Sequence, residues 1–170
     1  MPRRVRFLYN ILFPIFLLIA SPFYLWKLVR RGNWTEGFAQ RFGFYGKLGQ
    51  EIRGERVLWL HAVSVGEANL AVELVEELRK EFGDWRYVVS TTTTTGMGVL
   101  RSKLPDGARA VYYPIDWLPF VKSAFRTLDP SAIVLVEAEI WPNLFWEANR
   151  SGVPLHLVNA RLSEKSFEGY

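Results

Sequence analysis

From residue 57 onward, short apolar runs rich in β-forming residues alternate with segments that have helical spacing. This alternation is typical of βαβ units, which build a parallel sheet covered by helices. We therefore predict an α/β fold with a Rossmann-like parallel sheet. The predicted strands are Val57–His61, Arg86–Thr91, Ala110–Tyr113, Ala132–Val136 and Pro154–Asn159, and the predicted helices are Glu67–Phe82, Gly96–Leu104, Leu118–Leu128 and Pro142–Arg150.

The first thirty residues have a different character. No charge interrupts residues 7–26, and about 20 apolar residues suffice for a helix to cross the hydrocarbon core of a bilayer. We predict a hydrophobic membrane-anchor helix within residues 1–31. Pro14 and Pro22 leave open whether this helix crosses the membrane or lies partly in its interface, because each removes a backbone donor. The alternatives are a buried core helix and a signal peptide, and the basic residues after the run disfavour the signal peptide.

Charge also separates the anchor from the rest of the chain. Residues 1–31 contain six basic residues and no acid, whereas the remainder contains 15 basic and 17 acidic residues. A nucleic-acid-binding domain carries its positive charge on the folded part, so we expect no nucleic-acid partner. Basic residues beside an apolar run instead indicate contact with anionic lipid head groups.

The domain organisation follows from composition. Residues 32–55 are rich in glycine and charge, which is typical of a connector, and a short helix is predicted around Trp34–Phe42. Residues 56–170 form the predicted Rossmann-like domain. Its sheet ends soon after the fifth strand, and ligands of open parallel sheets bind at the carboxyl ends of the strands, often against another element. We therefore expect a second domain in the complete protein.

Several kinds of site are not predicted. The absence of cysteine excludes disulfides, thiolate metal sites and cysteine nucleophiles. His61 and His156 are most simply core or edge histidines. No spacing predicts a metal cage, a nucleophile elbow, a Walker-type phosphate loop or a dinucleotide fingerprint.

A turn of small residues joins the first predicted strand to its helix and places Glu67 in the first helical turn. A carboxylate there complements the helix dipole by up to about 1 kcal/mol, which is a sufficient structural interpretation. Gly66 directly before it, and the position at the end of the first strand, favour a second interpretation. In that interpretation Glu67 faces a crevice and accepts a proton.

A run of hydroxyl side chains, Ser90 followed by Thr91–Thr95, closes the second predicted strand and opens the next helix. Free backbone amides at a helix start, together with hydroxyls, can hold a phosphate or a sugar hydroxyl. Ordinary N-capping explains one of these residues. The run is therefore a candidate substrate-binding segment.

Two carboxylates, Glu137 and Glu139, end the otherwise apolar fourth strand. Alternation puts them on one face of the sheet if the strand continues through both. A buried carboxylate is costly unless it is paired or hydrogen-bonded, so two at a sheet edge need a reason. The structural alternative is that one caps the helix starting near Pro142 while the other pairs with an arginine such as Arg161.

Five phrases, in order along the chain, resemble the Kdo (3-deoxy-D-manno-octulosonic acid) transferases of Gram-negative bacteria. They are QRFGFYGKL at 40–48, LHAVSVGEANLA at 60–71, STTTTTG at 90–96, VEAEIWPNL at 136–144 and VNARLSEKS at 158–166. The SVGE and E-x-E-x-WPN phrases are specific in combination. The sequence departs from the pattern at Gln40, where many relatives have a glutamate before the arginine.

The resemblance implies an inverting, metal-independent glycosyltransferase of the two-domain GT-B type, with no cofactor. This chain would be its N-terminal, acceptor-binding half, inactive alone because CMP-Kdo is bound mainly by the other half. The reaction would transfer Kdo from CMP-Kdo to a lipid A precursor in lipopolysaccharide synthesis, at the cytoplasmic face of the bacterial inner membrane. By resemblance Glu67 is the general base and Glu137 supports the transition state. The candidate substrate-binding residues are Ser64, Gly66, Thr91, Thr92, Glu139 and Arg161.

Two other functions stay open at this point. One is a different membrane-surface GT-B glycosyltransferase that uses a UDP-sugar, which the E-x-E-x-WPN phrase disfavours. The other is a non-enzymatic, membrane-tethered binding domain. A further Rossmann-like half with basic and glycine-rich phosphate contacts would favour an enzyme.

Overall fold

The parallel sheet and its alternating helices are present as predicted. The computed structural model describes residues 3–30, 35–137 and 140–160. Its parallel strands are β1 Val57–His61, β2 Arg86–Thr91, β3 Arg109–Tyr112, β4 Pro130–Val136 and β5 Leu155–Val158. The helices between them are α3 Val65–Glu81, α4 Thr94–Lys103, α5 Leu118–Leu128 and α6 Pro142–Ser151. The predicted bounds of β1, β2 and α5 match the structure residue for residue.

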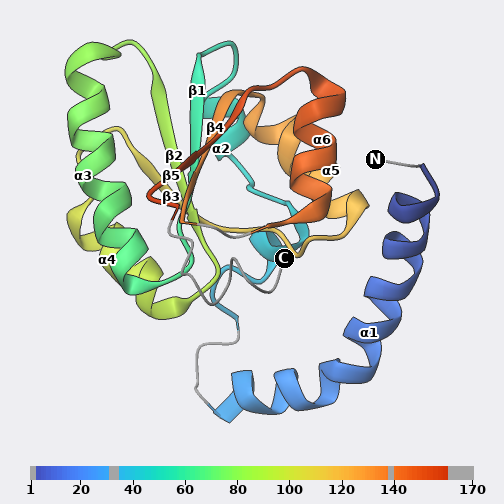
Figure 1. Ribbon diagram of the computed structural model, residues 1–170. Helices are drawn as coiled ribbons and strands as arrows, with labels where there is room; N and C mark the ends of the chain where they lie inside the picture. Colours follow the sequence, from blue (N-terminus) through green and yellow to red (C-terminus); the bar gives the residue numbers. More distant parts are fainter. Residues whose placement is uncertain (1–2, 31–34, 138–139, 161–170) are drawn as a thin grey trace.

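The strand order is β3-β2-β1-β4-β5, so the sheet reverses its direction of growth between β1 and β4. Figure 1 shows α3 and α4 on one face of the sheet and α5 and α6 on the other. The predicted Rossmann-like α/β fold is therefore confirmed. In sheets of this order, the reversal leaves a crevice at the carboxyl ends of the two central strands, where ligands bind.

Two apolar layers hold the helices on the sheet. Every residue of β1 is buried, and alternate side chains serve the two layers. Val57 and Trp59 belong to the layer under α5 and α6, whereas Leu58 and Leu60 belong to the layer under α3 and α4. Continuous burial is typical of parallel strands covered on both faces. Because all of its residues are buried and serve both layers, β1 is the centre of the core. Full burial of one large apolar side chain contributes about 1.5–3 kcal/mol to the stability of the fold.

Helix α3 starts at Val65, two residues before its predicted start, because Ser64 supplies the N-cap. Gly66 therefore lies inside the first helical turn. One apolar stripe of α3 faces the sheet. Its members pack in the layer under α3 and α4, with Val75 buried and Leu70, Leu74 and Leu78 half-buried.

The connector contains a shorter helix than predicted. Instead of one helix around Trp34–Phe42, the described part has a 3₁₀ helix, η1 Ala39–Phe42, and a single-turn helix, α2 Leu48–Glu51. Gly37 adopts a left-handed φ of 64°, which a continuous right-handed helix does not allow. A side chain at Gly37 would also overlap the ring of Tyr112. The connector packs on the domain, since it contributes Tyr45, Leu48 and Ile52 to the core.

Helix α1, Arg3–Arg30, lies outside the two layers of helices (Figure 1). By length and composition, its residues 4–22 could cross a membrane, with a mean hydropathy of 1.7. None of this stretch is buried in the protein. The alternative interpretation as a core helix is therefore wrong, and α1 remains a candidate membrane anchor.

His61 is a core histidine, as predicted, and is only 2% exposed. Its Nδ1 lies 3.1 Å from the carbonyl oxygen and 2.9 Å from the hydroxyl of Ser90, and its ring stacks 4.0 Å from that of Tyr113. The carbonyl can only accept, so Nδ1 carries the proton of the neutral ring. Burial lowers the pKa of His61 to about 3, although the hydrogen bond to the Ser90 backbone opposes this shift. His156 lies on the edge strand β5 and is exposed.

The free energy of unfolding should therefore fall as the pH is lowered from 7 to 5. His61 gains a proton in the unfolded chain, near its ordinary pKa, but stays neutral in the folded protein until about pH 3. We expect this residue to account for a loss of about 2 kcal/mol over that interval. Urea denaturation in detergent at both pH values, on the parent and on His61→Gln, measures the difference. Equal pH dependence of the two proteins would contradict the assignment.

Candidate functional site

Two of the carboxylates singled out by the sequence lie at the carboxyl ends of the adjacent strands β1 and β4. Glu67 follows β1 in the first turn of α3, and Glu137 directly follows β4. The two strands are neighbours, with His61 opposite Leu135, and their carboxyl ends meet at one edge. Paired strands lie about 4.8 Å apart. The topology therefore brings both residues to the edge of the sheet where ligands of this fold class commonly bind.

Glu67 closes a capping box at the start of α3. Its backbone N–H donates to the Ser64 hydroxyl over 3.2 Å, while its carboxylate accepts from the N–H groups of Ser64 over 3.2 Å and Val63 over 2.7 Å. The residue is 6% exposed. These bonds give Glu67 the structural role that its position predicted. A carboxylate offers about four lone-pair sites, so two amides do not exhaust its capacity as an acceptor.

Glu137 occupies a strained backbone position. Strand β4 ends at Val136, and Glu137 adopts a left-handed φ of 70°. The strand therefore does not continue through Glu137 to Glu139, and the condition for placing both carboxylates on one face fails. A left-handed conformation costs a residue with a side chain roughly 1–2 kcal/mol, and such strain concentrates at functional sites.

Contacts with β5 hold Glu137 in this conformation. Its N–H donates to the Val158 carbonyl over 2.9 Å, and its carboxylate accepts from the Asn159 side chain over 3.3 Å. Asn159 is itself left-handed, with a φ of 54°. The carboxyl ends of β4 and β5 thus end in two adjacent strained residues.

Part of the hydroxyl run has a structural role. Thr93 is the N-cap of α4, as expected for one member of the run, and accepts from Gly96 N–H over 3.1 Å. Thr91 is buried, and its hydroxyl and that of Thr93 both donate to the Val63 carbonyl. These bonds fasten the end of β2 to the turn that carries Glu67. Thr92 is half-buried at the same edge.

Arg41 is a residue that sequence reasoning did not select. Its guanidinium lies 4.3 Å from the centre of the Tyr112 ring and donates to the Thr92 carbonyl over 3.1 Å. Burial lowers its pKa. The only sequence feature that pointed to Arg41 was the phrase QRFGFYGKL, which contains it. The neighbouring Gln40, which departs from the family pattern, accepts from Tyr112 N–H over 2.7 Å, a role that a glutamate could also fill.

Asp116 is a second residue that the sequence did not indicate. Its carboxylate, on the loop before α5, accepts from the N–H groups of Asn143 and Leu144 over 3.0 and 3.2 Å and so caps α6. The Asn143 side chain donates back to the Asp116 carbonyl over 2.7 Å. Burial raises the pKa of Asp116, and the hydrogen bonds that its carboxylate accepts oppose the rise. The WPN phrase is thereby explained by helix capping, with Pro142 in the first turn.

The remaining predicted site residues are placed as follows. Ser64 and Gly66 are exposed at the start of α3. A side chain at Gly66 would meet nothing closer than 3.8 Å, so packing does not require glycine there. Glu139 and Arg161 lie outside the described residues. Among the described residues, no group of three or more His, Cys, Asp or Glu side chains is arranged to hold a metal ion.

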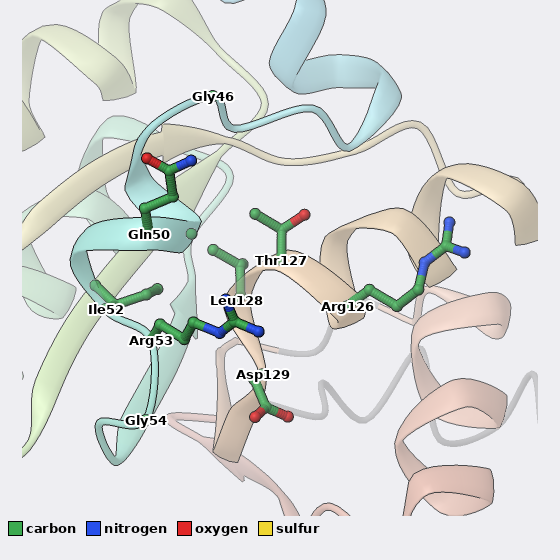
Figure 2. Close-up of a pocket in the computed structure, with 10 residues that line it drawn as sticks. Gly46, Gln50, Ile52, Arg53, Gly54, Arg126, Thr127, Leu128 and Asp129 are labelled. Carbon is green, nitrogen blue, oxygen red and sulfur yellow. The ribbon is translucent and has the colours of Figure 1, made fainter.

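A shallow pocket of about 430 Å³ lies at the opposite edge of the sheet (Figure 2). Its lining includes Arg53 and Gly54, which precede β1, and Arg126 and Asp129, which precede β4. Since these residues stand at the amino ends of the strands, the pocket does not serve Glu67 or Glu137.

Comparisons with known proteins identify the family of the chain. The family described as 3-deoxy-D-manno-octulosonic-acid transferase (kdotransferase) matches residues 36–170. The chain is 31% identical over 171 residues to the 3-deoxy-D-manno-octulosonic acid transferase of Chlamydia trachomatis serovar D, covering 97% of this chain. It is 34% identical over 170 residues to that of Rickettsia bellii, covering 100% of this chain. A probable mitochondrial 3-deoxy-D-manno-octulosonic acid transferase of Arabidopsis thaliana is 34% identical over 112 residues, which cover 66% of this chain and 25% of that protein.

The chain spans about two fifths of the length of the curated relatives that it matches most fully, 39% for both the Chlamydia and the Rickettsia proteins. The match to the family covers the whole sheet domain, including Glu67, Glu137 and the hydroxyl run. The chain belongs to the 3-deoxy-D-manno-octulosonic acid transferase family.

Proposed function

We propose that the complete protein transfers Kdo from CMP-Kdo to a lipid A precursor in lipopolysaccharide synthesis, and that this chain is the acceptor-binding half. The observation that carries the proposal is that Glu67 and Glu137 follow the adjacent strands β1 and β4 at one edge of the sheet, in a member of this family. The donor would be bound mainly by a second domain, so the chain alone would be inactive. The family membership favours Kdo over the UDP-sugar alternative.

In the proposed reaction, Glu67 is the general base. The acceptor hydroxyl gives its proton to the Glu67 carboxylate while its oxygen attacks the anomeric carbon of Kdo. The bond from that carbon to the phosphate oxygen of CMP breaks, and CMP leaves with the electron pair. One displacement inverts the anomeric configuration. The reaction needs no metal, because a nucleotide monophosphate is already a good leaving group.

The contacts around Glu67 suit this role. The amides of Val63 and Ser64 fix the carboxylate in one orientation, and a base must lie within about 2.6–3.2 Å of the proton donor that it serves. Glu137 would stabilise the positive charge that develops on the sugar in the transition state. Its strained backbone supports this role, since a glycine would occupy the position at lower cost.

Substrate contacts are proposed for the remaining residues of the edge. Ser64, Gly66 and Thr92 would contact the acceptor. Thr91, whose hydroxyl is bonded to Val63, would act by holding the Glu67 turn in place. Glu139 and Arg161, which lie outside the described residues, remain predicted substrate-binding residues from the family resemblance.

Because the proposed acceptor is a membrane lipid, a helix that binds the membrane would bring the enzyme to its substrate. We propose that α1 holds the enzyme at the cytoplasmic face of the bacterial inner membrane. The apolar stretch at residues 4–22 and the six basic residues among residues 1–31 support this localisation. A membrane-bound enzyme meets a membrane-bound acceptor more often than a free one does.

Replacing Glu67 by glutamine separates its structural and catalytic roles. A capping box accepts either residue, so we expect the full-length variant to fold and to lose about 1 kcal/mol at most from one weakened amide contact. Transfer should fall at least about 100-fold, because the amide cannot accept a proton. Val72→Ala, which shortens a buried side chain on α3, is the control. It should lose about 1–2 kcal/mol of stability yet keep transfer per folded molecule. Near-normal transfer by Glu67→Gln would refute the base assignment.

Replacing Glu137 by glycine tests the second carboxylate. Glycine relieves the left-handed strain, so we expect the free energy of unfolding to stay equal or rise by about 1 kcal/mol while transfer falls. Asp129→Gly is the matched control, because Asp129 also has a positive φ, 42°, but lies at the opposite edge of the sheet. Activity of that control should be unchanged. A Glu137→Gly protein that is both stable and fully active would remove Glu137 from the mechanism.

A further inference from the structure

The first turns of α1 run antiparallel to α6 and are bonded to it. Arg6 lies 3.4 Å from the Glu147 carboxylate, and Asn10 donates to the Asn143 side chain over 3.0 Å. Between them, the Tyr9 hydroxyl donates to Asp116 over 2.9 Å, and its ring meets that of Trp146 edge-on at 5.6 Å. Residues four apart on α1 thus meet residues four apart on α6.

Asn10 is bonded to α5 as well. Its side-chain oxygen accepts from Leu118 N–H over 3.1 Å, which satisfies an amide left free at the start of α5. Its backbone carbonyl accepts from the Trp117 indole over 3.2 Å. We call Tyr9, Asn10, Asp116 and Asn143 the latch. Asp116 and Asn143 are almost fully buried, so the latch is part of the folded domain.

The latch explains two polar residues that sit inside the apolar run. In hydrocarbon, the asparagine side chain would have to find partners or remain unsatisfied. Here the polar groups of Tyr9 and Asn10 are bonded to the domain. Below the latch, Phe13 continues this face and stacks 5.2 Å from Tyr9.

The opposite face of α1 is covered with exposed large apolar side chains. They are Val5, Phe7, Leu8, Ile11, Leu12, Ile15, Phe16, Leu18 and Ile19. Such a surface on a helix flanked by basic residues, with no acid among residues 1–31, fits a bilayer with anionic head groups.

Both ends of α1 are tied to the same domain. The latch holds its first turns, and residues 31–34 join its last residue to the connector, which packs on the core. Those few residues span roughly 18 Å at most when extended. A helix that crossed about 30 Å of hydrocarbon would have its ends on opposite sides of the membrane. In Figure 1, α1 instead runs from beside α6 to below the edge of the sheet where α3 and α6 begin.

We propose that α1 is a membrane-surface helix, fixed to the domain by the latch, with its exposed apolar face in one leaflet. It holds the carboxyl edge of the sheet toward the lipid. The purpose of this orientation is to offer a lipid-borne acceptor to the edge that carries Glu67 and Glu137. Only this purpose rests on the proposed function. The position of α1 itself follows from the latch and the connector.

Cysteine labelling tests the position of α1. The chain contains no cysteine, so single cysteines can be placed in the full-length protein once any elsewhere are changed to serine. In sealed vesicles with the domain outside, a membrane-impermeant maleimide should label Arg4→Cys as readily as the exposed domain control Lys103→Cys. Protection of Arg4→Cys until detergent is added would show a crossing helix and overturn the proposal.

Paired substitutions test the latch. Asn10→Leu should bind anionic vesicles as well as the parent protein, while the distance distribution between nitroxides at Arg4→Cys and Asn149→Cys broadens. Ile11→Asn, one residue along on the apolar face, should keep the narrow distribution and lose several-fold in vesicle binding. An unchanged distribution in Asn10→Leu would refute the latch, and unchanged binding of Ile11→Asn would refute the lipid-facing surface. Neither readout depends on transfer, so failure of the proposed function is detected separately, by absent transfer from CMP-Kdo.

Discussion

The arrangement of this protein depends on the pairing of β1 with both β2 and β4. Because β1 is buried at the centre of the sheet and the strand order reverses beside it, the residues that follow β1 and β4 must meet at one edge. Glu67 and Glu137, 70 positions apart in the sequence, come to one edge of the sheet for this reason. The apolar layers that fix the register therefore also fix the candidate site.

In the proposed mechanism, the structural and chemical roles of Glu67 coincide. The capping box that starts α3 orients the Glu67 carboxylate, and the hydroxyls of Thr91 and Thr93 hold the turn in front of it. A base held by backbone amides and a packed turn is preorganised, which catalysis favours over a mobile side chain.

The sequence predicted most of the fold because local periodicity specifies helices and buried strands. The predictions were wrong or incomplete where a residue's partners lie far away in the sequence, or where a glycine interrupts a helical pattern. The left-handed φ of Gly37 prevents the continuous helix predicted around Trp34–Phe42. Because Ser64 is the N-cap, α3 starts two residues before its predicted start. Asp116 caps α6 from 27 residues away, and no local pattern encodes that contact. The sequence likewise did not indicate the left-handed φ of Glu137, because the contacts that hold it come from Val158 and Asn159, about 20 residues away.

The central claim is that an acceptor hydroxyl meets Glu67 at the β1/β4 crevice. A structure of the complete protein with a lipid A precursor bound tests it most directly. The account predicts a sugar hydroxyl within about 2.6–3.2 Å of a Glu67 carboxylate oxygen. An acceptor bound at the opposite edge, in the pocket near Gly54 and Asp129, would contradict it.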